Sequence, residues 1–223
     1  MKSILALTLI SVALSIDVVF VGDSRMYLIA HHMFGFSDDP NVLPYIATGQ
    51  PVYAHGNSYH FVAMPGARVY DFAYQNTLGQ ALNTILSNSY SGAYVCLWLG
   101  LNNLGPSYPN GIQDTFTMYY ELAKSYPHLK FVIFSLAGVI ESLSRQLGSE
   151  VTNAYIKSYN FQMMRSVNQY PLPNLKYVNL MNGLDPMVTS EKYTIAPYLY
   201  DGMNLTRDGC IYFFNRFLGS LNF

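Results

Sequence analysis

The chain has 223 residues and a formal net charge of −1, and only 11% of its residues are charged, against roughly a quarter in typical soluble domains. This length suits one domain with a substantial core, and the lack of basic excess argues against a nucleic-acid partner. Tyrosine occurs 20 times, so we expect a surface rich in neutral hydrogen-bonding groups.

Residues 1–15 have the pattern of an export signal. Lys2 precedes an apolar stretch that ends at Leu14, and a small-x-small cleavage pattern stands before Ile16. Asp17 ends the apolar run well short of the ~20 residues that span a bilayer. We therefore expect a secreted or extracytoplasmic protein without stable membrane insertion, in which residues 16–223 form a single domain. A buried first strand or a membrane anchor is the alternative.

Five apolar, strand-like runs recur along the chain with helix-like segments between them. They cover residues 18–21, 61–64, 94–99, 131–136 and 177–180. Alternation of this kind predicts a parallel sheet with helices on both faces. The expected fold class is therefore α/β, a three-layer α/β/α sandwich around a five-stranded parallel sheet.

Three segments show the helical spacing of apolar residues. Asn110 is a plausible cap for the first helix and Thr206 for the last. The apolar faces comprise Ile112, Phe116, Tyr119, Tyr120 and Ala123 in the first segment, Val151, Tyr155, Tyr159, Met163 and Val167 in the second, and Ile211, Phe214 and Phe217 in the third. We interpret these stripes as core packing rather than as ligand sites.

The two cysteines do not indicate a disulfide scaffold. Cys96 lies in an expected core strand, where a thiol behaves as a small hydrophobe. A bridge from Cys96 to Cys210 remains open.

A serine stands directly behind the first apolar strand, in the run Gly22-Asp23-Ser24-Arg25. Strand ends of open α/β sheets face the crevice in which ligands bind. Gly22 permits a tight turn, and Asp23 and Ser24 can begin a helix whose positive end steadies negative charge at the serine. Arg25 can attract an anionic substrate or pair with a surface acid. An ordinary helix cap is the alternative for this motif.

Further special residues follow other expected strands or precede the last helix. They are Gly66, Gly100-Leu101-Asn102, and the run from Tyr200 to Asn204. Acyl transfer needs such a set, because it combines a hydroxyl nucleophile, donors for the oxyanion and a proton acceptor oriented by a carboxylate.

In this order the segments resemble the sequence blocks of the SGNH (GDSL-type) hydrolases, across essentially all of the mature chain. The matching runs are Gly22-Asp23-Ser24, Met64-Pro65-Gly66-Ala67, Gly100-Leu101-Asn102 and the run from Asp201 to Thr206. The resemblance implies a flavodoxin-like strand order and a carboxylesterase or carbohydrate deacetylase activity on a small-molecule or carbohydrate ester, without a cofactor or metal.

The resemblance also implies a role for each site residue. Ser24 would be the nucleophile, and Asp201 would orient the base. The backbone N–H groups of Ser24 and Gly66 and the side-chain amide of Asn102 would form the oxyanion hole.

The last block departs from the family at Asn204, where family members carry the catalytic histidine. A carboxamide has no basic nitrogen near neutral pH, so it cannot take the Ser24 proton. His31 and His32 lie two helical turns beyond Ser24, roughly 11 Å along the axis. His60 precedes Gly66 by most of a strand, and rescue by His55 from a loop is conceivable. We therefore expect low activity.

Two hypotheses follow from these residues. The first is an impaired serine ester hydrolase, and the second is a catalytically inactive pseudohydrolase that binds an ester or glycan in the same cleft. Asn204-Leu205-Thr206 is also an N-glycosylation pattern, and a glycan there would block the cleft. A flavodoxin-like nucleotide-binding module shares the expected sheet, but the chain has no phosphate-cradling glycine-rich loop.

Overall fold

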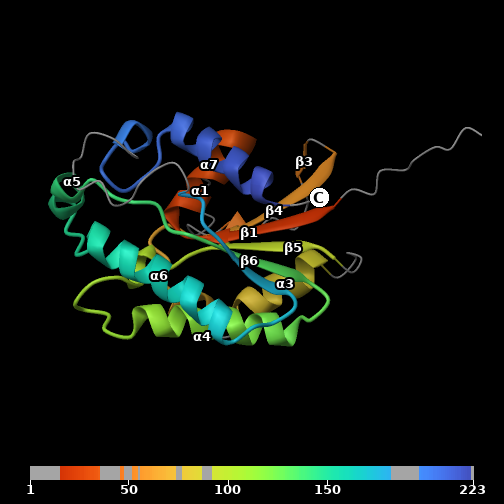
Figure 1. The fold of residues 1–223 in the computed structure, drawn as a ribbon. Helices are drawn as coiled ribbons and strands as arrows, with labels where there is room; N and C mark the ends of the chain where they lie inside the picture. The colour runs from red at the N-terminus through yellow and green to blue at the C-terminus, as the bar shows by residue number, and fades with distance from the viewer. Residues whose placement is uncertain are drawn as a thin grey trace, which may run out of the picture.

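The computed structural model describes residues 16–35, 46–47, 52–54, 56–73, 77–86, 92–181 and 196–221. Within these residues the strands form one mixed sheet of seven strands. Figure 1 shows this sheet between two layers of helices. The predicted three-layer α/β/α arrangement is confirmed. The expected export signal, residues 1–15, lies outside the described residues.

The parallel part of the sheet has the order β4-β1-β5-β6-β7, which is the flavodoxin-like order expected from the resemblance. Its strands are β1 (Asp17–Gly22), β4 (Asn57–Ala63), β5 (Tyr94–Trp98), β6 (Lys130–Phe134) and β7 (Leu175–Val178). All five predicted strands are present, although β4 begins four residues before the predicted start.

The predicted count of five strands is incomplete. Two short strands, β2 (Ile46–Ala47) and β3 (Val52–Ala54), pair antiparallel with β4 and extend the sheet along that edge. Segments of two and three residues carry no measurable period-2 pattern, so the sequence gives no signal for them.

Helices cover both faces of the sheet (Figure 1). On one face lie α1 (Ser24–Phe34) and α7 (Arg207–Ser220), and on the other α3 (Thr77–Leu86), α4 (Gly111–Ser125) and α6 (Asn153–Gln169). Shorter helices are α2 (Val69–Ala73), α5 (Glu141–Gln146) and the 3-10 turns η2 (Leu101–Asn103) and η3 (Ala196–Tyr198). No helix in the described part of the chain is long and apolar enough to cross a bilayer.

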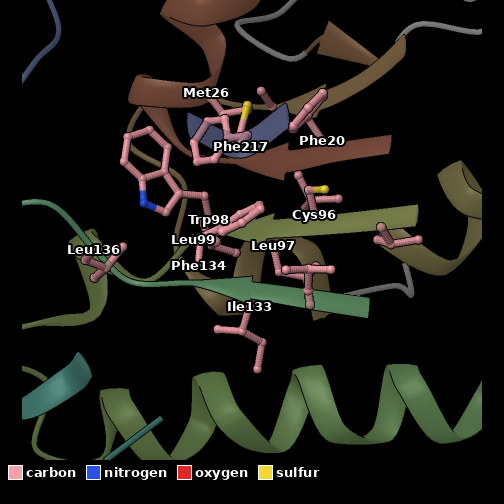
Figure 2. Packing of buried hydrophobic residues seen from close by; sticks show 14 of the residues in the cluster. Phe20, Met26, Cys96, Leu97, Trp98, Leu99, Ile133, Phe134, Leu136 and Phe217 are labelled. Atoms are coloured by element: carbon pink, nitrogen blue, oxygen red, sulfur yellow. The ribbon is translucent and has the colours of Figure 1, made fainter. Parts of the chain in front are cut away.

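An aromatic cluster fills the space between the sheet and α7. The ring of Phe217 lies 5.7 Å from Phe20, 5.0 Å from Trp98 and 4.7 Å from Phe134, measured between centroids. Figure 2 shows Phe20, Trp98 and Phe217 together on this side, with Ile133 on the opposite face. Because both faces are buried, the strands are apolar without alternation, as parallel strands require.

Three local predictions need correction. Asn110 occupies the N-cap position of α4 but makes no side-chain cap hydrogen bond. Ile211 is 37% exposed, and Cys210 and Phe213 face the core beside Phe214 and Phe217 instead. In the second predicted stripe, on α6, Ile156 is buried and Tyr155 is only half-buried, so Ile156 rather than Tyr155 belongs to the buried face.

Other local predictions are confirmed. Thr206 caps α7 by accepting a hydrogen bond from the Gly209 N–H at 3.1 Å. Cys96 and Cys210 are both buried and free, so the open question of a bridge is settled against it.

Candidate active site

Ser24 is the first residue of α1, directly after the carboxyl end of β1. Asp23 is the N-cap, and its Oδ1 accepts a hydrogen bond from the Arg25 N–H at 3.1 Å. Gly22 is needed for space rather than for its backbone conformation, because a Cβ there would lie 2.5 Å from the Met26 Cβ and 2.8 Å from the Trp98 oxygen. The glycine thus lets α1 begin immediately against β5.

Three strand ends meet at the level of Ser24. Gly22 at the end of β1 pairs in register with Ala63 of β4 and with Trp98 of β5. The Met64 N–H also donates to the Gly22 oxygen at 3.3 Å. The turns that follow these strands therefore lie together at the carboxyl end of the parallel strands, as the predicted site requires.

Gly66 lies in the turn after β4, with φ of +72° and an exposed backbone. A Cβ at this position would meet nothing within 4 Å. The left-handed conformation therefore accounts for the glycine at this position. The Ala67 N–H closes the turn by donating to the Met64 oxygen at 3.1 Å.

Two neighbouring asparagines attach the turn after β5 to the turn after β4. The Asn102 Nδ2 donates to the Ala67 oxygen at 3.0 Å, and the Asn103 Oδ1 accepts from the Val69 N–H at 2.9 Å. An amide nitrogen carries two N–H bonds, so Asn102 retains one donor after this contact. Asn103 was not singled out from the sequence, although it repeats the residue type of its neighbour.

Two tyrosines of the predicted core stripes, one in α4 and one in α6, support the turn after β5. The Tyr119 and Tyr159 hydroxyls both donate to the Leu99 oxygen, at 2.7 Å and 2.9 Å, and the Leu99 N–H donates to Tyr119 at 3.1 Å. Gly100 follows with φ of +127°, and a Cβ there would lie 2.8 Å from the Tyr159 ring. The sequence places these tyrosines on a buried face but does not reveal that they hold the Asn102 turn.

The Asp201–Asn204 turn forms a closed set of hydrogen bonds. The Asp201 Oδ1 accepts from the Met203 and Asn204 N–H groups at 2.9 Å and 2.6 Å, and its Oδ2 accepts from the Asn204 Nδ2 at 2.7 Å. Burial alone raises the pKa of Asp201, but the hydrogen bonds from Asn204 and Met203 outweigh it and lower the pKa below the ordinary value. Asp201 is therefore a carboxylate at neutral pH, and it already accepts hydrogen bonds from Asn204.

Arg25 corrects the expectation of an exposed arginine beside the serine. Its side chain is 1% exposed, and the guanidinium donates to the backbone oxygens of Met203, Ala137 and Gly138. An arginine with all three nitrogens engaged in the interior is not placed to attract an anionic substrate from solvent. It joins the Asp201–Asn204 turn to the start of α1, which carries Ser24.

The histidines of the described residues lie outside the Asp201–Asn204 turn in the sequence, and burial, His31 and Arg207 at the start of α7 lower the pKa of His32. His31 and His32 stand two turns along α1 from Ser24, His128 precedes β6, and His60 is inside β4. The His60 Nε2 lies 3.8 Å from the Asp17 Oδ1, at the amino end of β1. His55 lies outside the described residues.

No protein-family model and no curated protein sequence matches the chain. Solved structures match it over most of its length. A Streptococcus pneumoniae protein named for platelet activating factor has 16% identity and a TM-score of 0.62, covering 94% of this chain and 85% of its own. A protein described as a GDSL-like lipase from Parabacteroides merdae has 12% identity and a TM-score of 0.58, covering 92% and 94%.

A catalytic mutant of an acetylxylan esterase from Geobacillus stearothermophilus has 11% identity and a TM-score of 0.54, covering 93% of this chain and 94% of its own. At these identities the likeness concerns the fold. The chain has the fold of the GDSL/SGNH-like hydrolases, with Ser24 at the start of the helix that follows the first strand.

Proposed function

We propose that the protein is an exported serine ester hydrolase of the SGNH type with low turnover, acting on a carboxylic or carbohydrate acetyl ester. The observation that carries this proposal is the convergence of four segments at one sheet edge. Ser24, Gly66 and Asn102 follow three adjacent strands, and Arg25 bonds the Asp201–Asn204 turn to the helix that begins with Ser24.

The proposed reaction begins with attack of the Ser24 hydroxyl oxygen on the ester carbonyl carbon. The oxyanion that forms would accept hydrogen bonds from the Ser24 and Gly66 N–H groups and from the second N–H of Asn102, which supply preorganised donors. The alcohol leaves with a proton, and water then hydrolyses the acyl-serine. In serine proteases that lack a triad residue, the oxyanion hole and substrate binding together leave a residual rate of about 10³- to 10⁴-fold over water.

Asn204 limits the first step, because the Ser24 proton has no strong acceptor in the turn. The Asn204 Nδ2 donates to Asp201, the direction in which the base of a catalytic triad donates to its carboxylate. The turn thus retains the carboxylate contact of a triad without its basic nitrogen. This is why we assign low turnover rather than loss of the whole site.

A non-catalytic role in the same cleft is the second candidate. The hydrogen bonds between Asp201 and Asn204 favour this role. The neutral Asn204 amide donates to the Asp201 carboxylate, and this contact is stable without transfer of a proton. An ester or glycan ligand would then bind at the Ser24 edge without turnover. The acetylxylan esterase among the structural neighbours makes acetylated carbohydrate a suitable ligand to test for both candidates.

The test is the substitution Asn204→His, assayed with a short acyl ester of p-nitrophenol and with an acetylated xylo-oligosaccharide. We expect the rate to rise on the order of 10³-fold or more, since loss of a triad base costs 10⁴- to 10⁶-fold in serine proteases. The added activity must disappear in the Ser24→Ala, Asn204→His double variant. Asn110→His, at an exposed position without a side-chain cap bond, is the matched control.

An organophosphonate probe supplies an independent readout of Ser24. Labelling of the native protein at Ser24, absent in Ser24→Ala, supports a competent nucleophile. If neither the native protein nor Asn204→His is labelled or hydrolyses any tested ester, the hydrolase proposal is wrong. Binding of the acetylated oligosaccharide that is then lost in Ser24→Ala would favour the second candidate.

A further inference from the structure

A charged side chain is buried directly beside the candidate nucleophile. Arg25 follows Ser24 in the first turn of α1, and only 1% of its surface is exposed. Burial of an ion is strongly unfavourable unless its hydrogen-bonding groups are paired. The positions of the three backbone oxygens that pair with the guanidinium therefore indicate the role of the buried Arg25 side chain.

All three guanidinium nitrogens donate to backbone oxygens in segments distant in the chain. Nε donates to Met203 at 2.8 Å, Nη1 to Ala137 at 2.7 Å and Nη2 to Gly138 at 2.9 Å. Met203 lies within the Asp201–Asn204 turn, and the other two acceptors lie in the loop after β6. One side chain thus joins three segments at the edge that holds the candidate site.

The loop after β6 is itself held rigidly by α6. The Asn160 side chain accepts from the Leu136 N–H at 2.7 Å and donates to the Leu136 oxygen at 2.9 Å. Asn153 holds Val139 in the same two-sided way, at 2.9 Å for each bond. Arg25 is therefore anchored to acceptors whose own positions are fixed.

The loop after β6 and the Asp201–Asn204 turn are also bonded to one another. The Ile140 N–H donates to the Gly202 oxygen at 2.8 Å. Gly202 has φ of +88°, and a Cβ there would lie 2.6 Å from the Leu143 Cβ and 2.9 Å from the Ile140 oxygen. The Asp201–Asn204 turn is therefore bonded both to the loop after β6 and to Arg25, which is itself bonded to that loop.

We propose that Arg25 is a positioning residue of the candidate site, whose guanidinium fixes the Asp201–Asn204 turn against the first turn of α1 and hence against Ser24. The roles of Ser24 and Asp201 in this statement rest on the proposed function. Burial lowers the pKa of Arg25 to about 10, partly opposed by the charges of Asp23 and Asp201, so the side chain stays cationic at neutral pH. Its charge therefore also favours the carboxylate form of Asp201.

Arginine suits this role better than lysine. A guanidinium presents donors in a fixed planar fork, whereas an ammonium concentrates its donors on one nitrogen. Arg25→Lys keeps the charge but cannot reach acceptors in two segments with the same geometry, and Arg25→Met removes both charge and donors. Arg165→Lys, on the exposed face of α6, is the matched control.

Amide hydrogen exchange tests the proposal without reference to activity. The Met203 and Asn204 N–H groups are the reporters, because both donate to the Asp201 Oδ1. We expect both amides to exchange about 10-fold faster or more in Arg25→Lys, because the turn loses charge-assisted hydrogen bonds that hold it in place. Amides of β5 should be unchanged, and Arg165→Lys should match the native protein.

Trp98 monitors folding in the same samples. It is the only tryptophan, it is buried, and its ring centroid lies 5.9 Å from the Arg25 Cζ. A folded Arg25→Lys protein whose Met203 and Asn204 amides remain as protected as in the native protein overturns the proposal. Arg25→Met must show the same selective loss of protection, which provides a second variant.

The kinetic test uses the Asn204→His protein as background. Adding Arg25→Lys should lower kcat up to about 10²-fold with little change in KM, as expected for a misplaced orienting carboxylate. Unchanged kcat despite faster exchange would overturn the link from the turn to Ser24. If Asn204→His has no activity at all, the proposed function fails, whereas hydrogen exchange still decides whether Arg25 fixes the turn.

Discussion

Asp23 gives the sharpest prediction, because an ionisable group is buried beside Ser24 with only one of its carboxylate oxygens bonded. Its Oδ1 caps α1, and its Oδ2 has no hydrogen-bond partner among the described residues. Burial raises the pKa of Asp23 from 3.8 to about 6, against the opposing effects of the Arg25 charge and of backbone N–H groups. We predict that replacing it with asparagine changes how stability depends on pH.

The sign follows from proton binding. The folded state holds the Asp23 proton more tightly than the unfolded state, so the stability due to protonation is fully present below pH 3.8. It is lost as the pH rises through about 6. The difference between these pKa values corresponds to about 3 kcal/mol of unfolding free energy.

Asp23→Asn keeps an acceptor oxygen for the cap but cannot ionise. We therefore expect the stability of Asp23→Asn relative to the native protein to increase by about 2 kcal/mol between pH 4 and pH 7, because part of the effect already lies below pH 4. Subtracting the two proteins at each pH cancels the titration of other carboxylates, including Asp201. Urea unfolding followed by the fluorescence of Trp98 measures both. A difference that stays flat from pH 4 to pH 7 would refute the reasoning.

Two further predictions concern the supports of the site and the start of the chain. Tyr119→Phe should lower the unfolding free energy by about 1–3 kcal/mol, and by more than Tyr159→Phe does, because only Tyr119→Phe leaves the Leu99 N–H unpaired. Urea titration of both variants measures this difference, and equal losses would contradict it. Expression of residues 1–223 in a secreting host should yield a protein in the medium that begins at about Ile16 by N-terminal sequencing, and intracellular retention with Met1 intact would count against an export signal.

Much of the sheet could be predicted from the sequence because its signals are local. Parallel strands buried on both faces leave continuous apolar runs, and the turn at Ser24 follows such a run directly. The strand order came from the family resemblance rather than from the runs themselves. The short strands β2 and β3 cannot be predicted from the sequence, because they are defined by pairing with β4 and are too short to show an alternating pattern of apolar residues.

The supports of the site were not predictable, because they depend on contacts between distant segments. Arg25 reads as a surface charge until the fold brings Ala137, Gly138 and Met203 around it. Tyr159 fits a core stripe equally well with or without its bond to Leu99. Helical spacing reports which face of a helix is buried, but not which polar atom a buried hydroxyl reaches.

The self-contained Asp201–Asn204 turn has an evolutionary consequence. Asparagine at position 204 occupies the Asp201 carboxylate as an imidazole N–H would, so the local hydrogen bonding does not require a base. Every asparagine codon becomes a histidine codon by one change at its first nucleotide. Under the proposed function, gain or loss of a proton acceptor here is therefore one mutational step, so selection on chemistry at this position can act separately from selection on folding.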